Sequence, residues 1–219
     1  GRLHVDTKPS GREQIIITPS VGKKFETTFN KRSVMLDLKA DLQENTTYNI
    51  NFREAIQDIT EKNPAIVKLA FSTGSYIDSL SINGRVQDAL TEKDQNNYTV
   101  ALAEASDTFS IFKHPASWIT VTNKKGQYAL ENLKAGTYVL YAFDDNNRNL
   151  IVDSKSEQYG FLSQQINLTK NVDSVKLRTF KLDVNKLKLI SARTTFAYFD
   201  IRFSKSLIRY SVTPIDSTV

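Results

Sequence analysis

Apolar and polar residues alternate one by one along much of this sequence, and residues 126–145 show the pattern most clearly. Tyr128 and Leu130 lie two positions apart, a short run containing Asn, Lys and Gly follows, and Tyr138 and Leu140 resume the alternation. A period of two places successive side chains on opposite faces of a strand, and Asn and Gly between two such runs favour a turn. The segment therefore predicts two strands joined as a β-hairpin of a small sandwich.

The same alternation recurs along the whole chain, which predicts an all-β protein. Each run has one apolar and one mostly polar face, as antiparallel strands with one wet side require. The expected strands are residues 15–18, 34–39, 47–52, 67–72, 80–86, 98–103, 118–122, 165–168, 177–182, 199–203 and 208–212. The one helix that the pattern predicts is short, at residues 53–58. No apolar run approaches the roughly 20 residues that a membrane-spanning helix needs.

Small and polar residues interrupt the strand pattern at residues 72–78, and we place a domain junction there. The expected organisation is a series of tandem β-sandwich modules: residues 1–75, residues 76–174, and part of a third β module at residues 175–219. The last part is too short to bury a core of its own easily. Two interpretations stay open: the chain stops inside a third module, or this piece completes a sheet elsewhere.

The residues that most catalytic and metal sites need are scarce. The chain has no cysteine, and its two histidines, His4 and His114, lack metal-ligand spacing. Its eight glycines form no phosphate-binding motif. A carboxylate pair acting on a glycosidic bond would meet only in the fold, and nothing in the sequence singles one out. We therefore expect a protein that is not an enzyme and requires no cofactor.

The net charge of +5 is unevenly distributed. Residues 176–219 carry nine Lys or Arg against three Asp, a net charge of +6, and residues 1–175 sum to −1. A basic segment can indicate a nucleic acid or an anionic membrane surface as partner. Here, however, basic residues such as Lys176 and Arg178 alternate with apolar ones, which indicates the solvated face of a sheet. No nucleic acid partner is expected.

Three stretches, residues 45–58, 63–89 and 126–150, resemble the Ig-like domain-containing surface lipoproteins of Bacteroidota. In that family an Ig-like domain of the S-layer type is followed by a transthyretin-like sandwich, akin to carboxypeptidase regulatory modules. The resemblance implies these two folds for the first two modules and no enzymatic activity. It also implies export to the cell surface, with membrane contact only through a lipid anchor on the outer membrane that lies outside this chain. Residues 90–95 depart from the family pattern, which implies a remodelled turn.

The loop at residues 144–153 has the spacing of a calcium-binding loop. Asp145, Asn147, Asn149 and Asp153 occupy positions 1, 3, 5 and 9, with the Ile151 carbonyl at position 7. Position 6 lacks glycine and position 12 lacks glutamate, so any calcium affinity would be weak. The alternative is an Asx-turn loop, in which the same side chains accept hydrogen bonds from their own backbone. Calcium is the one candidate cofactor, and both interpretations stay open.

Two serines stand in an Asp-Ser-apolar pattern, Ser79 and Ser174. The pattern resembles the general O-glycosylation acceptor of Bacteroidota, which would place both serines in accessible linkers. Trp118, the single tryptophan, has two interpretations: a sugar-stacking surface or a core anchor.

The residues and the resemblance together predict a non-catalytic cell-surface lipoprotein subunit that is a structural or docking module in an outer-membrane protein complex. Its expected partner is an outer-membrane or cell-surface protein. The alternative is a glycan-binding accessory module for polysaccharide capture. A docking protein should expose an apolar patch or an unpaired strand edge, whereas a glycan binder should display coplanar aromatic side chains. Tyr141, Phe143 and Tyr159 are the aromatic candidates for the second function.

Overall fold

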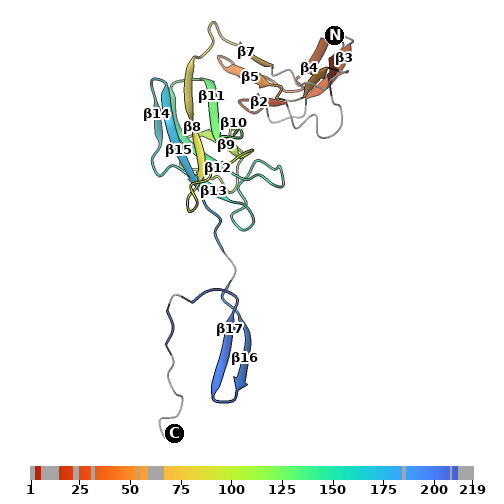
Figure 1. The fold of residues 1–219 in the computed structure, drawn as a ribbon. Coiled ribbons are helices and arrows are strands. Elements are labelled where there is room, and N and C mark those ends of the chain that lie inside the picture. Colours follow the sequence, from red (N-terminus) through yellow and green to blue (C-terminus); the bar gives the residue numbers. More distant parts are fainter. Residues whose placement is uncertain are drawn as a thin grey trace. The chain divides into compact units, whose positions relative to one another are not determined.

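All regular elements of the described chain are β-strands, which confirms the all-β prediction (Figure 1). The computed structural model describes residues 3–5, 15–21, 25–30, 33–53, 55–58, 67–183, 186–207 and 209–211. Contacts divide the chain into two units, Gly1–Leu182 and Asp183–Val219. In the part of the chain that the structure describes, no helix is long and apolar enough to cross a membrane.

The N-terminal part of the first unit builds three small sheets around one core. Its strands are β1 (Leu3–Val5), β2 (Ile16–Thr18), β3 (Glu26–Asn30), β4 (Ser33–Asp37), β5 (Thr47–Asn51), β6 (Ile56–Asp58) and β7 (Lys68–Ser72). They pair as β2-β5-β7, β3-β4 and β1-β6. Alternate residues of β5, Tyr48 and Ile50, are buried in the core, where the Tyr48 ring stacks on the Phe71 ring with centroids 5.5 Å apart.

The helix predicted at residues 53–58 is not formed. Ile56–Asp58 is a strand, β6, that pairs antiparallel with β1. A helix of six residues has little stability of its own, because the first turn costs more conformational entropy than one hydrogen bond returns. Tertiary pairing with β1 and burial of Ile56 therefore decide the conformation.

The rest of the first unit is a sandwich of two sheets. Its strands are β8 (Leu80–Asp88), β9 (Thr99–Glu104), β10 (Trp118–Val121), β11 (Gln127–Leu133), β12 (Gly136–Phe143), β13 (Tyr159–Phe161), β14 (Ile166–Leu168) and β15 (Val172–Thr179). One sheet has the order β11-β8-β15 and the other the order β10-β9-β12-β13, with β14 also paired to β12. The expected junction at residues 72–78 lies between β7 and β8.

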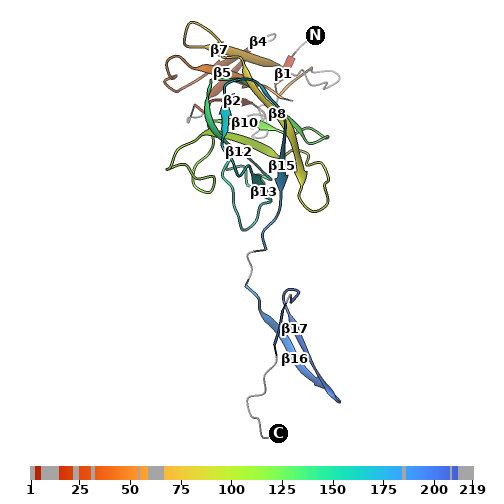
Figure 2. The same ribbon diagram turned by 90° about the vertical axis from the view of Figure 1, so that its left-hand side faces the viewer.

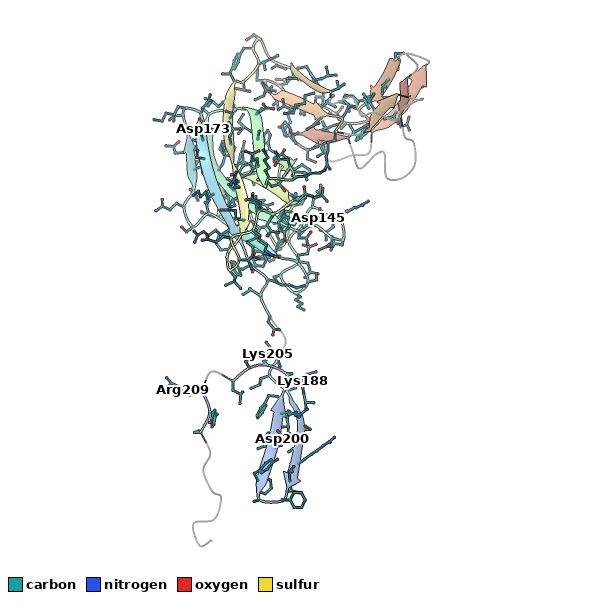
Figure 3. The ribbon with its side chains drawn as sticks, in the orientation of Figure 1. Asp145, Asp173, Lys188, Asp200, Lys205 and Arg209 are labelled. Carbon is teal, nitrogen blue, oxygen red and sulfur yellow. The ribbon has the colours of Figure 1, made fainter. Side chains whose placement is uncertain are left out.

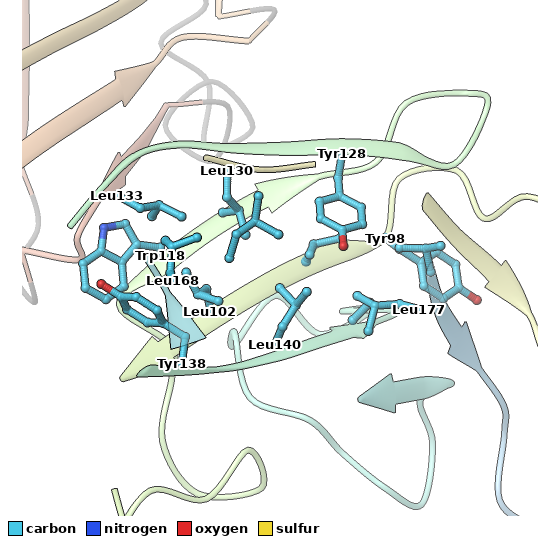
Figure 4. Packing of buried hydrophobic residues seen from close by; sticks show 14 residues of the cluster. Tyr98, Leu102, Trp118, Tyr128, Leu130, Leu133, Tyr138, Leu140, Leu168 and Leu177 are labelled. Atoms are coloured by element: carbon cyan, nitrogen blue, oxygen red, sulfur yellow. The ribbon is translucent and has the colours of Figure 1, made fainter. Parts of the chain in front are cut away.

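The two strands predicted at residues 126–145 are present as β11 and β12, but they do not form a hairpin. β11 pairs with β8, and β12 pairs with β9, β13 and β14. The turn between them carries the chain from one sheet to the other. Figure 4 shows the reason: Leu130 of β11 and Leu140 of β12 point into the same core from opposite sides. Strands that face each other across a core cannot also be hydrogen-bonded neighbours.

A second apolar layer lies on the other face of the β9–β12 sheet. It includes Ala101 of β9, Tyr141 and Phe143 of β12, and Val152 of the loop before β13, all of them buried. The loop at residues 105–117 adds Phe109, Ile111 and Ala116 to this layer. The sheet is therefore apolar on both faces, which explains why every residue of Thr99–Ala103 is buried.

β15 runs across the boundary expected between residues 174 and 175. It pairs in parallel with β8, and Figures 1 and 2 both show the two strands side by side. This strand completes the second sandwich, whereas Asp183–Val219 is a separate unit. The close pairing requires Gly84, because a Cβ there would overlap the Val175 carbonyl oxygen and the Tyr128 side chain.

The second unit contains one antiparallel hairpin, β16 (Leu189–Thr195) with β17 (Tyr198–Phe203). The expected strand at residues 199–203 falls on β17. Of the strand expected at 208–212, residues 209–211 are not in a strand, and residues 208 and 212 lie outside the described residues.

We predict that Gly84→Ala destabilises the first unit by about 1–3 kcal/mol, because the added methyl group forces β15 away from β8. Urea unfolding of the purified chain measures this change. Gly136→Ala is the matched control, since the nearest atoms to its Cβ are 3.3 Å away on the Tyr138 ring. Equal free energies of unfolding for both variants would contradict the close approach of β8 and β15.

Candidate functional site

The four side chains of the predicted calcium loop accept hydrogen bonds from backbone N–H groups. The Asp145 carboxylate accepts from Asn149 and Leu150, at 3.1 and 3.2 Å. Asn147 accepts from Asn149 (3.1 Å), Asn149 from Ile151 (2.8 Å) and Asp153 from Lys155 (3.0 Å). This is the Asx-turn arrangement. Among the described residues no group of three or more His, Asp or Glu side chains could hold a metal ion. Calcium at this loop stays a prediction.

Glu157 closes the same loop from inside, and the sequence pattern did not identify it. Its side chain is buried, with one carboxylate oxygen accepting from the Asn146 N–H (3.2 Å) and the other from the Asp153 N–H (2.8 Å). Burial raises the pKa of the Glu157 carboxyl, and burial also raises that of Asp145. Figure 3 labels Asp145 in this loop. Two carboxyl groups therefore hold the loop backbone, which is a structural role.

The remodelled turn at residues 90–95 is organised by Asp88. One carboxylate oxygen of Asp88 accepts from the Leu90 N–H (2.9 Å) and the Thr91 N–H (2.7 Å). The other accepts from Gln158 Nε2 (2.7 Å), which also donates to the Thr179 carbonyl (3.2 Å). The hydrogen bonds from Thr91, Leu90 and Gln158 lower the pKa of Asp88 from 3.8 to about 2. This turn connects β8 to the start of β13 and the end of β15.

The first sandwich and the second meet through polar side chains. Lys68 Nζ lies 2.6 Å from a Glu131 carboxylate oxygen, and Asn49 donates to the Glu131 carbonyl (3.1 Å). In the connecting segment, the Thr47 hydroxyl donates to the Asp78 carboxylate at 2.7 Å. A shallow groove of about 220 Å³ lies beside these contacts, between β2-β5-β7 and β10-β11. Asn49, Lys68 and Glu131, which join the two modules, are among its lining residues.

The aromatic residues proposed for sugar binding are buried. Tyr141, Phe143 and Tyr159 belong to the second apolar layer of the sandwich, each 5% exposed or less. The Tyr141 and Phe143 rings stack at 5.8 Å, but within that layer. Trp118 is also buried, edge-on against Tyr138 at 5.5 Å, as the core-anchor interpretation predicts. These residues provide no exposed aromatic platform.

Both candidate O-glycosylation serines are exposed. Ser79 precedes β8, and Ser174 lies in a bulge of β15 with a φ of 62°. The neighbouring Asp173, labelled in Figure 3, accepts a hydrogen bond from Asn83 (2.9 Å). Both hydroxyl groups are therefore accessible, and their modification stays a prediction.

The hairpin of the second unit exposes an apolar surface. In its register Ala192 faces Ile201 and Thr194 faces Phe199, and these pairs alternate with the Arg193–Asp200 pair. Successive residues of a strand point to opposite sides. We define the apolar face of the hairpin by the side chains that share one side, Leu189, Ala192, Phe199, Ile201 and Phe203. Within residues 186–207 nothing covers it: Leu189 is 59%, Phe199 76% and Ile201 53% exposed.

Two further features mark the hairpin as a surface for contact. At its turn Phe196 is fully exposed and has a φ of 49°, a conformation that favours Gly or Asn over a bulky side chain. Leu187 and Leu207, beyond the strand ends, are 51% and 40% exposed. Large exposed apolar patches on soluble domains mark interaction sites. We take the apolar face of the hairpin as the candidate functional site.

We predict that Asp88→Asn lowers stability most at neutral pH. The lowered pKa means that the Asp88 carboxylate stabilises the fold above its ordinary pKa of 3.8, and that this stabilisation is lost as the pH falls from about 4 to about 2. The difference in melting temperature between the wild type and Asp88→Asn should therefore shrink over this range. Thermal unfolding followed by circular dichroism from pH 2 to 7 measures it; a constant difference would contradict the turn geometry.

We predict that Ser79 and Ser174 carry glycans when the protein is produced in its native host. Intact mass spectrometry should then give a mass above that of the sequence. Ser79→Ala combined with Ser174→Ala should restore the sequence mass, whereas Ser81→Ala, which does not follow an Asp, should leave the added mass unchanged. A native protein with only the sequence mass would rule the modification out.

Comparison with solved structures finds weak similarity to pilins of Gram-positive bacteria. A major pilin subunit of Bacillus cereus gives a TM-score of 0.30 at 10% identity, covering 82% of this chain and 56% of the pilin. A streptococcal ancillary pilin gives 0.29 at 12% identity, covering 67% of this chain and 44% of the pilin. The group B streptococcus pilus 2b backbone protein gives 0.27 at 12% identity, covering 81% of both chains. TM-scores this low support no inference about fold or function.

No curated protein matches the sequence significantly. One part of the chain does match a protein family. Residues 5–73, which include the sheet β2-β5-β7, match the family of the bacterial Ig-like domain.

Proposed function

We propose that the protein is a non-catalytic subunit of the bacterial cell surface, in which β-sandwich modules support a docking element that binds a partner protein. The bacterial Ig-like match at residues 5–73 supports a surface protein with a structural role. The finer setting, a lipoprotein in an outer-membrane complex, rests on the sequence resemblance to Bacteroidota lipoproteins. The lipid anchor belongs to that part of the proposal.

The observation that carries the proposal is the uncovered apolar face of the β16–β17 hairpin. A two-stranded hairpin alone is marginally stable in water, because its side chains have nothing to pack against. Fully burying a Leu, Ile or Phe side chain contributes about 1.5–3 kcal/mol. Covering Leu189, Phe199 and Ile201 would therefore contribute several kcal/mol, enough to order the hairpin and hold a partner.

Among the described residues of the two sandwiches, the exposed large apolar side chains lie on several separate elements, such as Met35 on β4, Leu90 after β8 and Phe161 on β13. Most of their other apolar side chains form three buried clusters, and the contacts between the two modules include the Lys68–Glu131 ion pair. The glycan-binding alternative has less support, because Tyr141, Phe143 and Tyr159 are buried. Docking through the second unit is the better explanation of where apolar side chains are exposed.

We predict that Phe199→Asp combined with Ile201→Asp abolishes co-purification of a stoichiometric companion from the native envelope. Two carboxylates on the apolar face would have to be buried at a cost that the contact cannot offset. Leu90→Asp is the matched control, since Leu90 is an exposed leucine at the turn after β8, outside the hairpin. Chemical cross-linking before solubilisation, followed by mass spectrometry, identifies the companion. Recovery of the wild-type protein alone would contradict the docking function.

A further inference from the structure

The hairpin has two open strand edges. Among residues 186–207, β16 and β17 pair only with each other. In an antiparallel pair every second residue directs its N–H and C=O groups away from the partner strand. Such an edge is a template for a further strand from another chain. This inference rests on the proposed docking function. The side chains along the two edges then indicate which kind of strand would bind.

The two edges differ in charge. On β17 the Arg202 Nε lies 3.2 Å from an Asp200 carboxylate oxygen, so the charges on that strand compensate each other. On β16 Arg193 faces Asp200 in the register but has no acidic partner within the described residues. Lys188 directly precedes β16 and likewise has no acidic partner there, and Figure 3 shows it at the open end of the hairpin. The β16 edge is therefore cationic.

The cationic side chains of β16 and its apolar side chains lie on opposite faces of the hairpin. Ala192 lies on the apolar face, and Arg193, the next residue, lies on the polar one. A strand added beside β16 would thus meet apolar neighbours on one side and cationic neighbours on the other. Cross-strand pairs of opposite charge stabilise a sheet, and like charges directly opposite destabilise it.

We propose that the free edge of β16 binds an extended strand of a partner protein whose side chains alternate between apolar and acidic. The apolar side chains of that strand extend the apolar face beyond Ala192, and its carboxylates pair with Arg193 and Lys188. Backbone hydrogen bonds supply the register, and the charges select the partner. A second copy of this chain fits poorly, because it would place its own Arg193 and Lys188 beside the same cations.

The test uses the full chain and a fluorescently labelled nine-residue peptide of alternating valine and glutamate. Fluorescence anisotropy should show binding that weakens as salt is added, because the pairing is partly electrostatic. Amide hydrogen exchange should show new protection at β16 and not at β17. A peptide of alternating valine and lysine should not bind.

Charge reversal separates the strand-edge proposal from simple attraction between opposite charges. Arg193→Glu should weaken binding of the valine–glutamate peptide by about five- to tenfold, because a cross-strand repulsion replaces the attraction at this residue. The same variant should gain binding of the valine–lysine peptide. Lys170→Glu, an equal change of net charge at an exposed position between β14 and β15, should alter neither.

Three results would overturn the inference: equal binding of both peptides, protection at β17 alone, or a β16 edge already protected in the free protein. The last would mean that the chain itself or a second copy covers the edge, and sedimentation would tell these two apart. If the peptides fail while Phe199→Asp with Ile201→Asp still loses the envelope companion, the docking function stands and the chemistry of the partner strand is wrong.

Discussion

The burial of alternate side chains between two sheets determines most of this structure. Leu130 and Tyr128 from one sheet meet Leu140 and Tyr138 from the other in a core that is almost fully closed to solvent. Closing that core assigns β11 and β12 to different sheets, although only a short turn separates them. It also requires β15 to lie against β8 so closely that only glycine fits at residue 84.

The same constraint shows how far the sequence could predict the fold. A period of two reports which residues share a face, so the strands around Tyr48, Leu102 and Leu140 could be placed from their alternation. The alternation does not show which strands are hydrogen-bonded neighbours, because a strand buries the same alternate residues whichever strand lies beside it. The predicted hairpin at residues 126–145 and the predicted helix at residues 53–58 were wrong for this reason. In both segments the pairing partner is distant in sequence.

The candidate site was predictable in part. Spacing identified the loop with Asp145 and Asn149, but it could not show that backbone N–H groups already occupy those oxygens. Nor could it find Glu157, whose role depends on burial. The alternation at residues 199–203 predicted a strand with an apolar side. That this side is uncovered is a property of the three-dimensional arrangement, because a covered and an uncovered strand have the same sequence pattern.

The charges of the hairpin give its exposure a consistent explanation. An open edge beside an apolar face favours pairing between copies of the same chain. Arg193 and Lys188 oppose such pairing, since every copy brings the same cations to the same edge. The same side chains attract a strand of opposite charge, and binding would then stabilise the hairpin in proportion to the occupancy of the complex. In the proposed function, a hairpin that is marginal alone and ordered by its partner would couple folding of the second unit to docking, whereas the first unit has buried cores of its own.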